Sequence, residues 1–177
     1  PTAYDANLAY YMPTAVRGGY TFDGWTLKKA ESYKIVNNST YNYIRIQADN
    51  TLFKVGTKVY FDVSFSGTLT QIDVNDINTP ASSYTISGNR IVGEYTITSD
   101  KLIGTYSFID FNFSSGTASL SDFVVNSFEV MSADVVTAQT IVNTPYDHTL
   151  VAQWTAKEVE VTIKNLSGTT AEGTVMG

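Results

Sequence analysis

The sequence predicts an all-β fold, either an antiparallel sandwich or a barrel, on three observations. Apolar and polar residues alternate with a period of two, in short runs rich in Val, Ile, Thr, Tyr and Phe. Helical spacing of apolar residues is nowhere sustained. Gly, Asn, Asp, Ser and Pro separate the runs, which recur roughly every 8–12 residues. Such spacing is typical of strands that follow one another without intervening helices.

The first strand of this kind is expected over residues 41–48. Ile44 and Ile46 would lie on one face, while Tyr43 and Arg45 would lie on the other, because successive side chains of a strand point to opposite faces. One face is therefore apolar and suited to a core. The opposite face is aromatic and polar.

The clearest alternation occupies residues 58–65. Val59, Phe61 and Val63 point one way and polar residues or tyrosine point the other way, as in a half-buried strand. Gly67 follows and marks a turn. We therefore expect this strand to contribute one wall of the core.

Further strands are expected along the middle of the chain, each ended by turn residues. In the last of them, Phe123, Val124 and Val125 are consecutive apolar residues that break the alternation. A bulge, or a strand covered on both faces, would explain the break. The expected ranges are 68–74, 83–86, 90–98, 105–113 and 119–131.

Two aromatic motifs lie near the ends of the chain and resemble the two parts of one known motif. Together they resemble the internalin-B-type, or Listeria–Bacteroides, repeats of Gram-positive surface proteins. In that family a Gly-Tyr-x-Phe-x-Gly-Trp turn precedes a strand ending in Leu-x-Ala-x-Trp. The matching residues here are Gly19, Tyr20, Phe22, Gly24 and Trp25 in the first part, and Leu150, Ala152 and Trp154 in the second.

This resemblance implies a division of the chain. The two motif parts usually lie a few tens of residues apart, whereas a long segment separates them here. Since an insertion in a surface loop costs little closure entropy, a second unit can be accommodated between them. The implied organisation is a small β-rich base of residues 1–27 and 141–165, a sandwich of residues 28–140, and a linker or tail of residues 166–177.

The middle segment has a resemblance of its own. Strand-like stretches at residues 58–65, 91–97, 108–113 and 118–125 are similar in order to jelly-roll carbohydrate-binding modules. The resemblance implies a jelly-roll-like β-sandwich and a glycan ligand. Near the C-terminus, residues 157–164 alternate cleanly and predict an amphipathic strand that would lie at a sheet edge.

Composition excludes several classes of function. The net charge of −6 and the absence of a basic run make nucleic acid a poor partner. No apolar stretch approaches the roughly 20 residues of a membrane-spanning helix. The chain has no Cys and one histidine, His148, with no Gly-x-Ser-x-Gly motif beside it. We therefore predict a protein that is not an enzyme.

Aromatic residues are the candidate ligand-binding residues. Tyr41 and Tyr43 lie two apart on the outer face of one strand, beside Arg45, and tyrosine rings can stack on the apolar faces of sugars. Tyr84 and Tyr106 are further candidates. Two other aromatic residues, Trp25 and Trp154, are expected to pack a small core instead.

Oxygen-rich and acidic residues have structural explanations. Asp73, Asn75, Asp76 and Asn78 would suit Ca²⁺, but the rhythm of an EF-hand is missing and such clusters commonly form turns. We predict no metal and no cofactor. Carboxylate pairs for glycoside hydrolysis would be Asp110 with Glu129, or Asp62 with Glu94, and the spacing selects neither pair.

The sequence thus predicts a non-catalytic module for adhesion or recognition, extracellular or at a bacterial cell surface, with glycan as the favoured ligand and a protein partner as the other option. The alternative is a structural protein of a bacteriophage virion, such as a capsid decoration, head-fibre or tail component. That alternative implies a homo-oligomer or a virion assembly. Neither hypothesis includes nucleic acid or membrane insertion.

Overall fold

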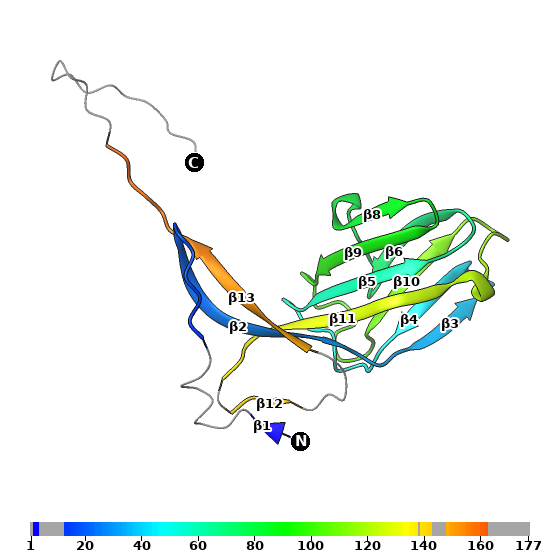
Figure 1. Ribbon diagram of the computed structural model, residues 1–177. Coiled ribbons are helices and arrows are strands. Elements are labelled where there is room, and N and C mark those ends of the chain that lie inside the picture. The colour runs from blue at the N-terminus through cyan, green and yellow to red at the C-terminus, as the bar shows by residue number, and fades with distance from the viewer. Residues whose placement is uncertain (1, 4–12, 138, 143–147, 163–177) are drawn as a thin grey trace, which may run out of the picture.

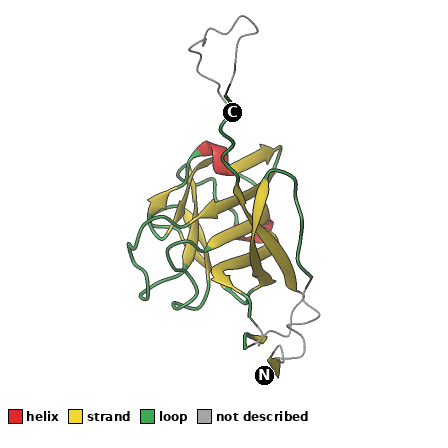
Figure 2. Cartoon of the chain, turned by 90° about the vertical axis from the view of Figure 1, so that its left-hand side faces the viewer, coloured by secondary structure: helices red, strands yellow, loops and turns green. Residues whose placement is uncertain are grey.

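A computed structural model describes residues 2–3, 13–137, 139–142 and 148–162. Two antiparallel sheets face each other as a sandwich (Figure 1), which confirms the predicted fold class. Helix is limited, in the described residues, to the single turns Ala81–Ser83 and Leu120–Asp122 (Figure 2). None of the described helices is long and apolar enough to cross a membrane.

The smaller of the two facing sheets has five strands and the larger has six. In spatial order, the five-stranded sheet contains β3 (Lys34–Asn38), β4 (Tyr43–Gln47), β10 (Phe108–Phe113), β6 (Leu69–Val74) and β7 (Ile77–Asn78). The six-stranded sheet contains β13 (His148–Ala156), β2 (Tyr20–Ala30), β11 (Val124–Val135), β5 (Lys58–Ser64), β9 (Arg90–Thr96) and β8 (Tyr84–Ser87). A separate short pair joins β1 (Thr2–Ala3) to β12 (Ile141–Val142).

The core lies between the facing sheets and follows the predicted alternation. Val59, Phe61 and Val63 of β5 are buried, as are Ile44 and Ile46 of β4. Aromatic rings join the layers edge to face, a favourable arrangement for aromatic pairs. The ring centroids of Phe61 and Phe111 lie 5.6 Å apart, and those of Phe111 and Phe123 lie 5.3 Å apart.

The irregularity predicted near Phe123 is present in β11. Its pairing with β5 changes register between Val125 and Ser127. A bulge of this kind adds a residue on one strand and restores the alternation beyond it. As a result Phe128 and Val130 return to the core.

Strand β2 is long and belongs to two environments. Near Ala30 it pairs with β11 inside the sandwich sheet, whereas near Tyr20 it pairs with β13 alone. The β2–β13 ribbon therefore extends beyond the sandwich (Figure 1). The two end motifs of the sequence lie side by side in it, and the boundary expected between Leu27 and Lys28 falls within this continuous strand.

Aromatic side chains pack against one another on this ribbon. The Phe22 ring lies 5.4 Å from the Trp25 ring and 5.5 Å from the Trp154 ring, centroid to centroid. The Trp25 indole N–H donates a hydrogen bond of 2.7 Å to the carbonyl oxygen of Pro13. The two tryptophans thus pack through the same phenylalanine, and both rings stay partly exposed.

The strand predicted over residues 157–164 is wrong for its described part. Residues 157–162 are exposed and belong to no strand, and residues 163–164 lie outside the described residues. Val159 and Val161 are 76% and 59% exposed. The Lys157 N–H still donates to the Gly19 carbonyl at 2.8 Å, but the strand β13 ends at Ala156. Alternation alone does not make a strand, because a strand also needs a neighbouring strand to satisfy its backbone groups.

Candidate functional site: a groove between two tyrosines

The outer face of the five-stranded sheet carries two of the predicted site residues, Tyr43 and Arg45 of β4. Arg45 donates two hydrogen bonds to the Asp110 carboxylate, at 2.6 and 2.9 Å. Its guanidinium carbon lies 3.6 Å from the centre of the Phe108 ring and 4.9 Å from that of Tyr43. Arg45 is thus fixed by a carboxylate and by two rings.

The Arg45–Asp110 pair is largely removed from water. The side chains are 17% and 6% exposed. Burial raises the pKa of Asp110 above its ordinary value, although the Arg45 guanidinium acts in the opposite direction. The hydrogen bond to Asp110 also raises the pKa of Arg45. The two hydrogen bonds and the burial therefore hold both side chains in place on this face.

Amide and carboxylate groups continue the same face across β10 and β6. Asn112 donates a hydrogen bond of 2.9 Å to Asp73, and Gln71 donates one of 2.6 Å to the same carboxylate. On the other side, Asn38 donates to the Tyr43 hydroxyl at 3.1 Å. Each of these polar side chains is held by a neighbouring one, so the face is ordered without a ligand.

The remaining predicted residues are distributed over the molecule. Tyr41 lies in the turn after β3, is 74% exposed, and donates its backbone N–H to the Asn38 side chain at 3.0 Å. Tyr84 belongs to β8 of the other sheet and packs against the core. Of these three tyrosines, only Tyr106 is connected to Tyr43 and Arg45. Its ring packs on Phe108, with the centroids 6.1 Å apart, and Arg45 lies over the same Phe108 ring.

The oxygen-rich segment after β6 forms a turn. Asn75 is 2% exposed, accepts a hydrogen bond from the Phe108 N–H at 3.0 Å and donates one to the Tyr106 carbonyl at 2.9 Å. Asn75 and Asp76 have φ values of +47° and +60°. Asn75 thereby positions the start of β10. No group of three acidic or histidine side chains suited to a metal was found in the described residues.

A groove of about 590 Å³ lies beside the outer face, next to the start of β3 and the end of β4. The groove is shallow and open to solvent. Two tyrosines, several amide or hydroxyl side chains, one lysine and one carboxylate line it. We call it the Tyr33–Tyr106 groove, defined by Ser32, Tyr33, Lys34, Gln47, Ala48, Asp49, Asn50, Thr105 and Tyr106.

Each tyrosine of the groove is supported by a buried phenylalanine of a different sheet. Tyr33 stands edge-on to Phe128 of β11, with the centroids 5.7 Å apart and an interplanar angle of 90°. Tyr106 stands on Phe108 of β10 at an interplanar angle of 68°. The two tyrosines are 41% and 43% exposed, so each presents ring surface while its position is fixed.

A tight turn fixes the carboxylate of the groove. The backbone N–H and the hydroxyl of Thr51 donate to one Asp49 oxygen, at 2.9 and 2.6 Å. These bonds hold the pKa of Asp49 below its ordinary value. A carboxylate offers about four acceptor positions, so hydrogen-bonding capacity remains for a ligand hydroxyl.

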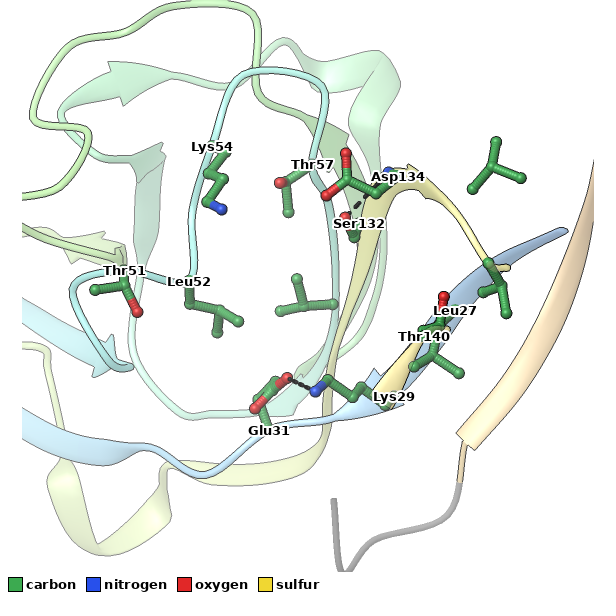
Figure 3. A pocket seen from close by; sticks show the side chains of 13 residues that line it. Leu27, Lys29, Glu31, Thr51, Leu52, Lys54, Thr57, Ser132, Asp134 and Thr140 are labelled. Atoms are coloured by element: carbon green, nitrogen blue, oxygen red, sulfur yellow. Dashed lines mark hydrogen bonds and ion pairs between the residues drawn. The ribbon is translucent and has the colours of Figure 1, made fainter. Parts of the chain in front are cut away.

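A second cavity of about 410 Å³ lies between β2, β11 and the loop that follows β4 (Figure 3). It contains two carboxylates, Glu31 and Asp134, and two ammonium groups, Lys29 and Lys54. The Lys29 ammonium lies 3.3 Å from a Glu31 oxygen. Among the described residues, the remaining walls of this cavity are aliphatic or hydroxyl-bearing.

Of the two carboxylate pairs predicted from the sequence, one is divided between the two sheets and the other lies on neighbouring strands. Asp110 and Glu129 belong to different sheets. Asp62 and Glu94 lie on the neighbouring strands β5 and β9, where Glu94 faces Tyr60. Arg90 makes two hydrogen bonds to the Asp62 carboxylate and holds its pKa below the ordinary value. Among the described residues that line the groove, Asp49 is the one carboxylate.

Comparison of the whole chain with known proteins found no matching family model, no matching curated protein and no matching solved structure. The resemblances to internalin-B-type repeats and to carbohydrate-binding modules therefore stay predictions.

Tyr33, Gln47, Asp49 and Asn50 were not among the residues singled out from the sequence. Gln47 occupies the same face of β4 as Tyr43 and Arg45, and this spacing was a usable signal. Tyr33 precedes β3, and Asp49 and Asn50 follow β4. Because β3 and β4 pair antiparallel, with Lys34 opposite Gln47, these flanking residues meet at one end.

Proposed function

We propose that the protein is a non-catalytic recognition module that binds a glycan in the Tyr33–Tyr106 groove. The main support for this proposal is that one groove contains two half-exposed tyrosines together with Gln47, Asp49 and Asn50. Each tyrosine ring packs on a buried phenylalanine ring. Flat aromatic surface and adjacent hydrogen-bonding groups are what a pyranose, with an apolar face and peripheral hydroxyls, requires.

The rigidity of the groove supports this proposal energetically. Binding must offset the entropy lost when ligand and side chains are ordered, roughly 0.5–1.5 kcal/mol for each immobilised flexible side chain. Here Asp49 is held by Thr51, and each tyrosine rests on a buried phenylalanine ring. Little further ordering of the protein is needed on binding. Recognition of surface polysaccharides during adhesion is the role that we assign to such a site.

The test is a glycan array followed by titration calorimetry of the strongest hit. We expect Tyr33→Ala and Tyr106→Ala each to weaken binding by roughly tenfold, because each removes a ring on which the sugar would stack. Tyr106→Phe keeps the ring and should retain most of the affinity. Tyr41→Ala removes a tyrosine outside the groove and serves as the matched control.

Three outcomes would contradict the proposal. The first is an array without any bound glycan. The second is unchanged affinity in the Tyr33→Ala/Tyr106→Ala double variant, with near-native circular dichroism. The third is shortening of the bound saccharide during incubation, detected by mass spectrometry, because it would make the protein an enzyme.

A further inference from the structure

Strand β13 is the outermost strand of the six-stranded sheet. It pairs over its nine residues with β2, and no strand of the described residues pairs on its other side. A free strand edge presents unpaired N–H and C=O groups that can accept another strand. The question is which strand this edge accepts.

The hydrogen-bonding pattern shows which groups of β13 point outward. The Val136 N–H donates to the Trp25 carbonyl at 2.7 Å, so the backbone groups of Trp25 face away from β13. Ala152, directly opposite Trp25, therefore belongs to a pair without mutual hydrogen bonds. Its N–H and C=O point away from β2. The same holds for Leu150, two residues earlier.

The β13 edge lacks most of the features that normally protect a free strand. Its pairing with β2 has a register shift between Gln153 and Trp154, where Asp23 is the extra residue on β2. Natural edge strands are short, or they carry charges, proline or bulges on the edge side. The sequence from His148 to Ala156 contains no Lys, Arg, Asp, Glu or Pro. By contrast β8, at the opposite edge of the same sheet, has only four residues. The two edges of the sheet are thus unequal, and β13 is the one open to pairing.

We propose that β13 pairs antiparallel with β13 of a second copy of this chain. Complete overlap of the nine residues is reached when Ala152 faces Ala152 of the second copy, and the outward N–H and C=O of this residue then bond reciprocally. Two six-stranded sheets would become one continuous sheet of twelve strands. The pairing is closed by a two-fold axis, so it ends at a dimer.

The lack of charged side chains in β13 and the limited stability of a two-stranded ribbon favour a second copy as the partner of this edge. The chain carries a net charge of −6, which opposes self-association, yet the uncharged β13 brings no like charges together when it meets itself. The β2–β13 ribbon also has only two strands where it leaves the sandwich. Isolated two-stranded ribbons are marginally stable in water. Pairing would place this part of the chain in a four-stranded layer.

The absence of cysteine allows a direct test of this register. A short bis-maleimide should cross-link Ala152→Cys between two copies, because directly opposite Cα atoms of a hydrogen-bonded pair lie about 5.5 Å apart. The reagent is needed because the Cβ atoms of such a pair are farther apart than those of an unstrained disulfide. Thr85→Cys, exposed on the other edge strand β8, is the matched control. We expect rapid cross-linking for the first variant and background cross-linking for the second.

The mass in solution tests the same pairing without a cross-link. Light scattering of the full chain at roughly 1–100 μM should show about twice the 19.4 kDa chain mass at the upper end. In the proposed register Ala152 faces Ala152 of the second copy, whereas within its own chain it lies opposite Trp25. The Ala152→Lys variant therefore places like charges opposite each other only in the dimer and should be monomeric, with native circular dichroism.

A monomeric native chain throughout this range would overturn the proposal. It would also fail if the lysine variant stayed dimeric or if the cysteine at position 85 cross-linked as fast as that at position 152. This proposal is independent of glycan binding. The groove and β13 are different surfaces, so each can fail without the other.

Discussion

Phe111→Ala is expected to lower the free energy of unfolding by about 3–5 kcal/mol, the usual cost of removing a buried phenylalanine ring. Phe111 is fully buried and contacts the rings of Phe61 and Phe123, so it joins β10 to β5 and to the segment before β11. Few side chains could move into the vacated space. Urea denaturation followed by circular dichroism measures the change.

Phe111→Leu should cost less, since it keeps more of the buried volume. Tyr41→Ala, at an exposed turn, should change the free energy of unfolding by no more than about 0.5 kcal/mol. A loss below about 1 kcal/mol in Phe111→Ala would show that this ring does not hold the facing sheets together. That result would contradict the packing described for the core.

Arg45→Met is expected to cost about 3–5 kcal/mol at neutral pH, because it leaves the Asp110 carboxylate buried without its partner. Asp110 is only 6% exposed as a side chain and accepts both of its strong hydrogen bonds from Arg45. The methionine retains much of the contact with Phe108. The loss therefore reports on the unpaired charge more than on packing.

This variant should also show a distinctive pH dependence. Burial already raises the folded-state pKa of Asp110, and removal of Arg45 removes a group that lowers it. The folded state then binds a proton that the unfolded state releases, so the variant should gain stability as the pH falls from the raised pKa toward the ordinary value of 3.8. Chemical denaturation between neutral and acidic pH measures this gain.

Two further variants separate charge from other effects. Arg45→Met/Asp110→Leu removes both charges and should recover most of the stability lost in the single variant. Arg90→Met breaks the Arg90–Asp62 pair, whose arginine is 59% exposed, and should have a small effect because solvent screens exposed pairs. Equal losses in Arg45→Met and Arg90→Met would contradict the assignment of a buried charge.

The parts of the fold that were predictable are those in which the two faces of a strand differ. In β5 every second residue is buried, so alternation identified the strand and its inner face. The break near Phe123 predicted either a bulge or a strand covered on both faces, and the structure has a register shift between Val125 and Ser127. By contrast β3, with the sequence Lys-Ile-Val-Asn-Asn, shows no clear alternation and was missed.

The groove was only partly predictable, because residues from different layers form it. Tyr106 was a candidate, but nothing in its local pattern places it in one groove with Tyr33, which rests on the other sheet. Likewise the burial of Phe108 on the outer face depends on Arg45 and Tyr106 lying over it. Such contacts arise from sheet order and register, which the period of a strand does not specify.

Dimerisation through β13 would increase the affinity of the protein for a repeating glycan. If β13 pairs with itself, each dimer carries two Tyr33–Tyr106 grooves. Binding of the second groove to a repeating glycan is then an intramolecular step, and the overall affinity can exceed that of one groove by roughly 10²–10⁴-fold where the spacing fits. Weak binding by one groove would thus suffice for adhesion to a polysaccharide surface.

The central claim is that glycan binds in the Tyr33–Tyr106 groove, and NMR titration of the isotopically labelled chain with the strongest array hit tests it most directly. We predict chemical-shift changes concentrated at the backbone amides of the groove, among them Gln47, Asp49 and Asn50, and at the ring protons of Tyr33 and Tyr106. Shifts centred on the Lys29–Glu31 cavity or on β8, with the groove unchanged, would contradict the claim.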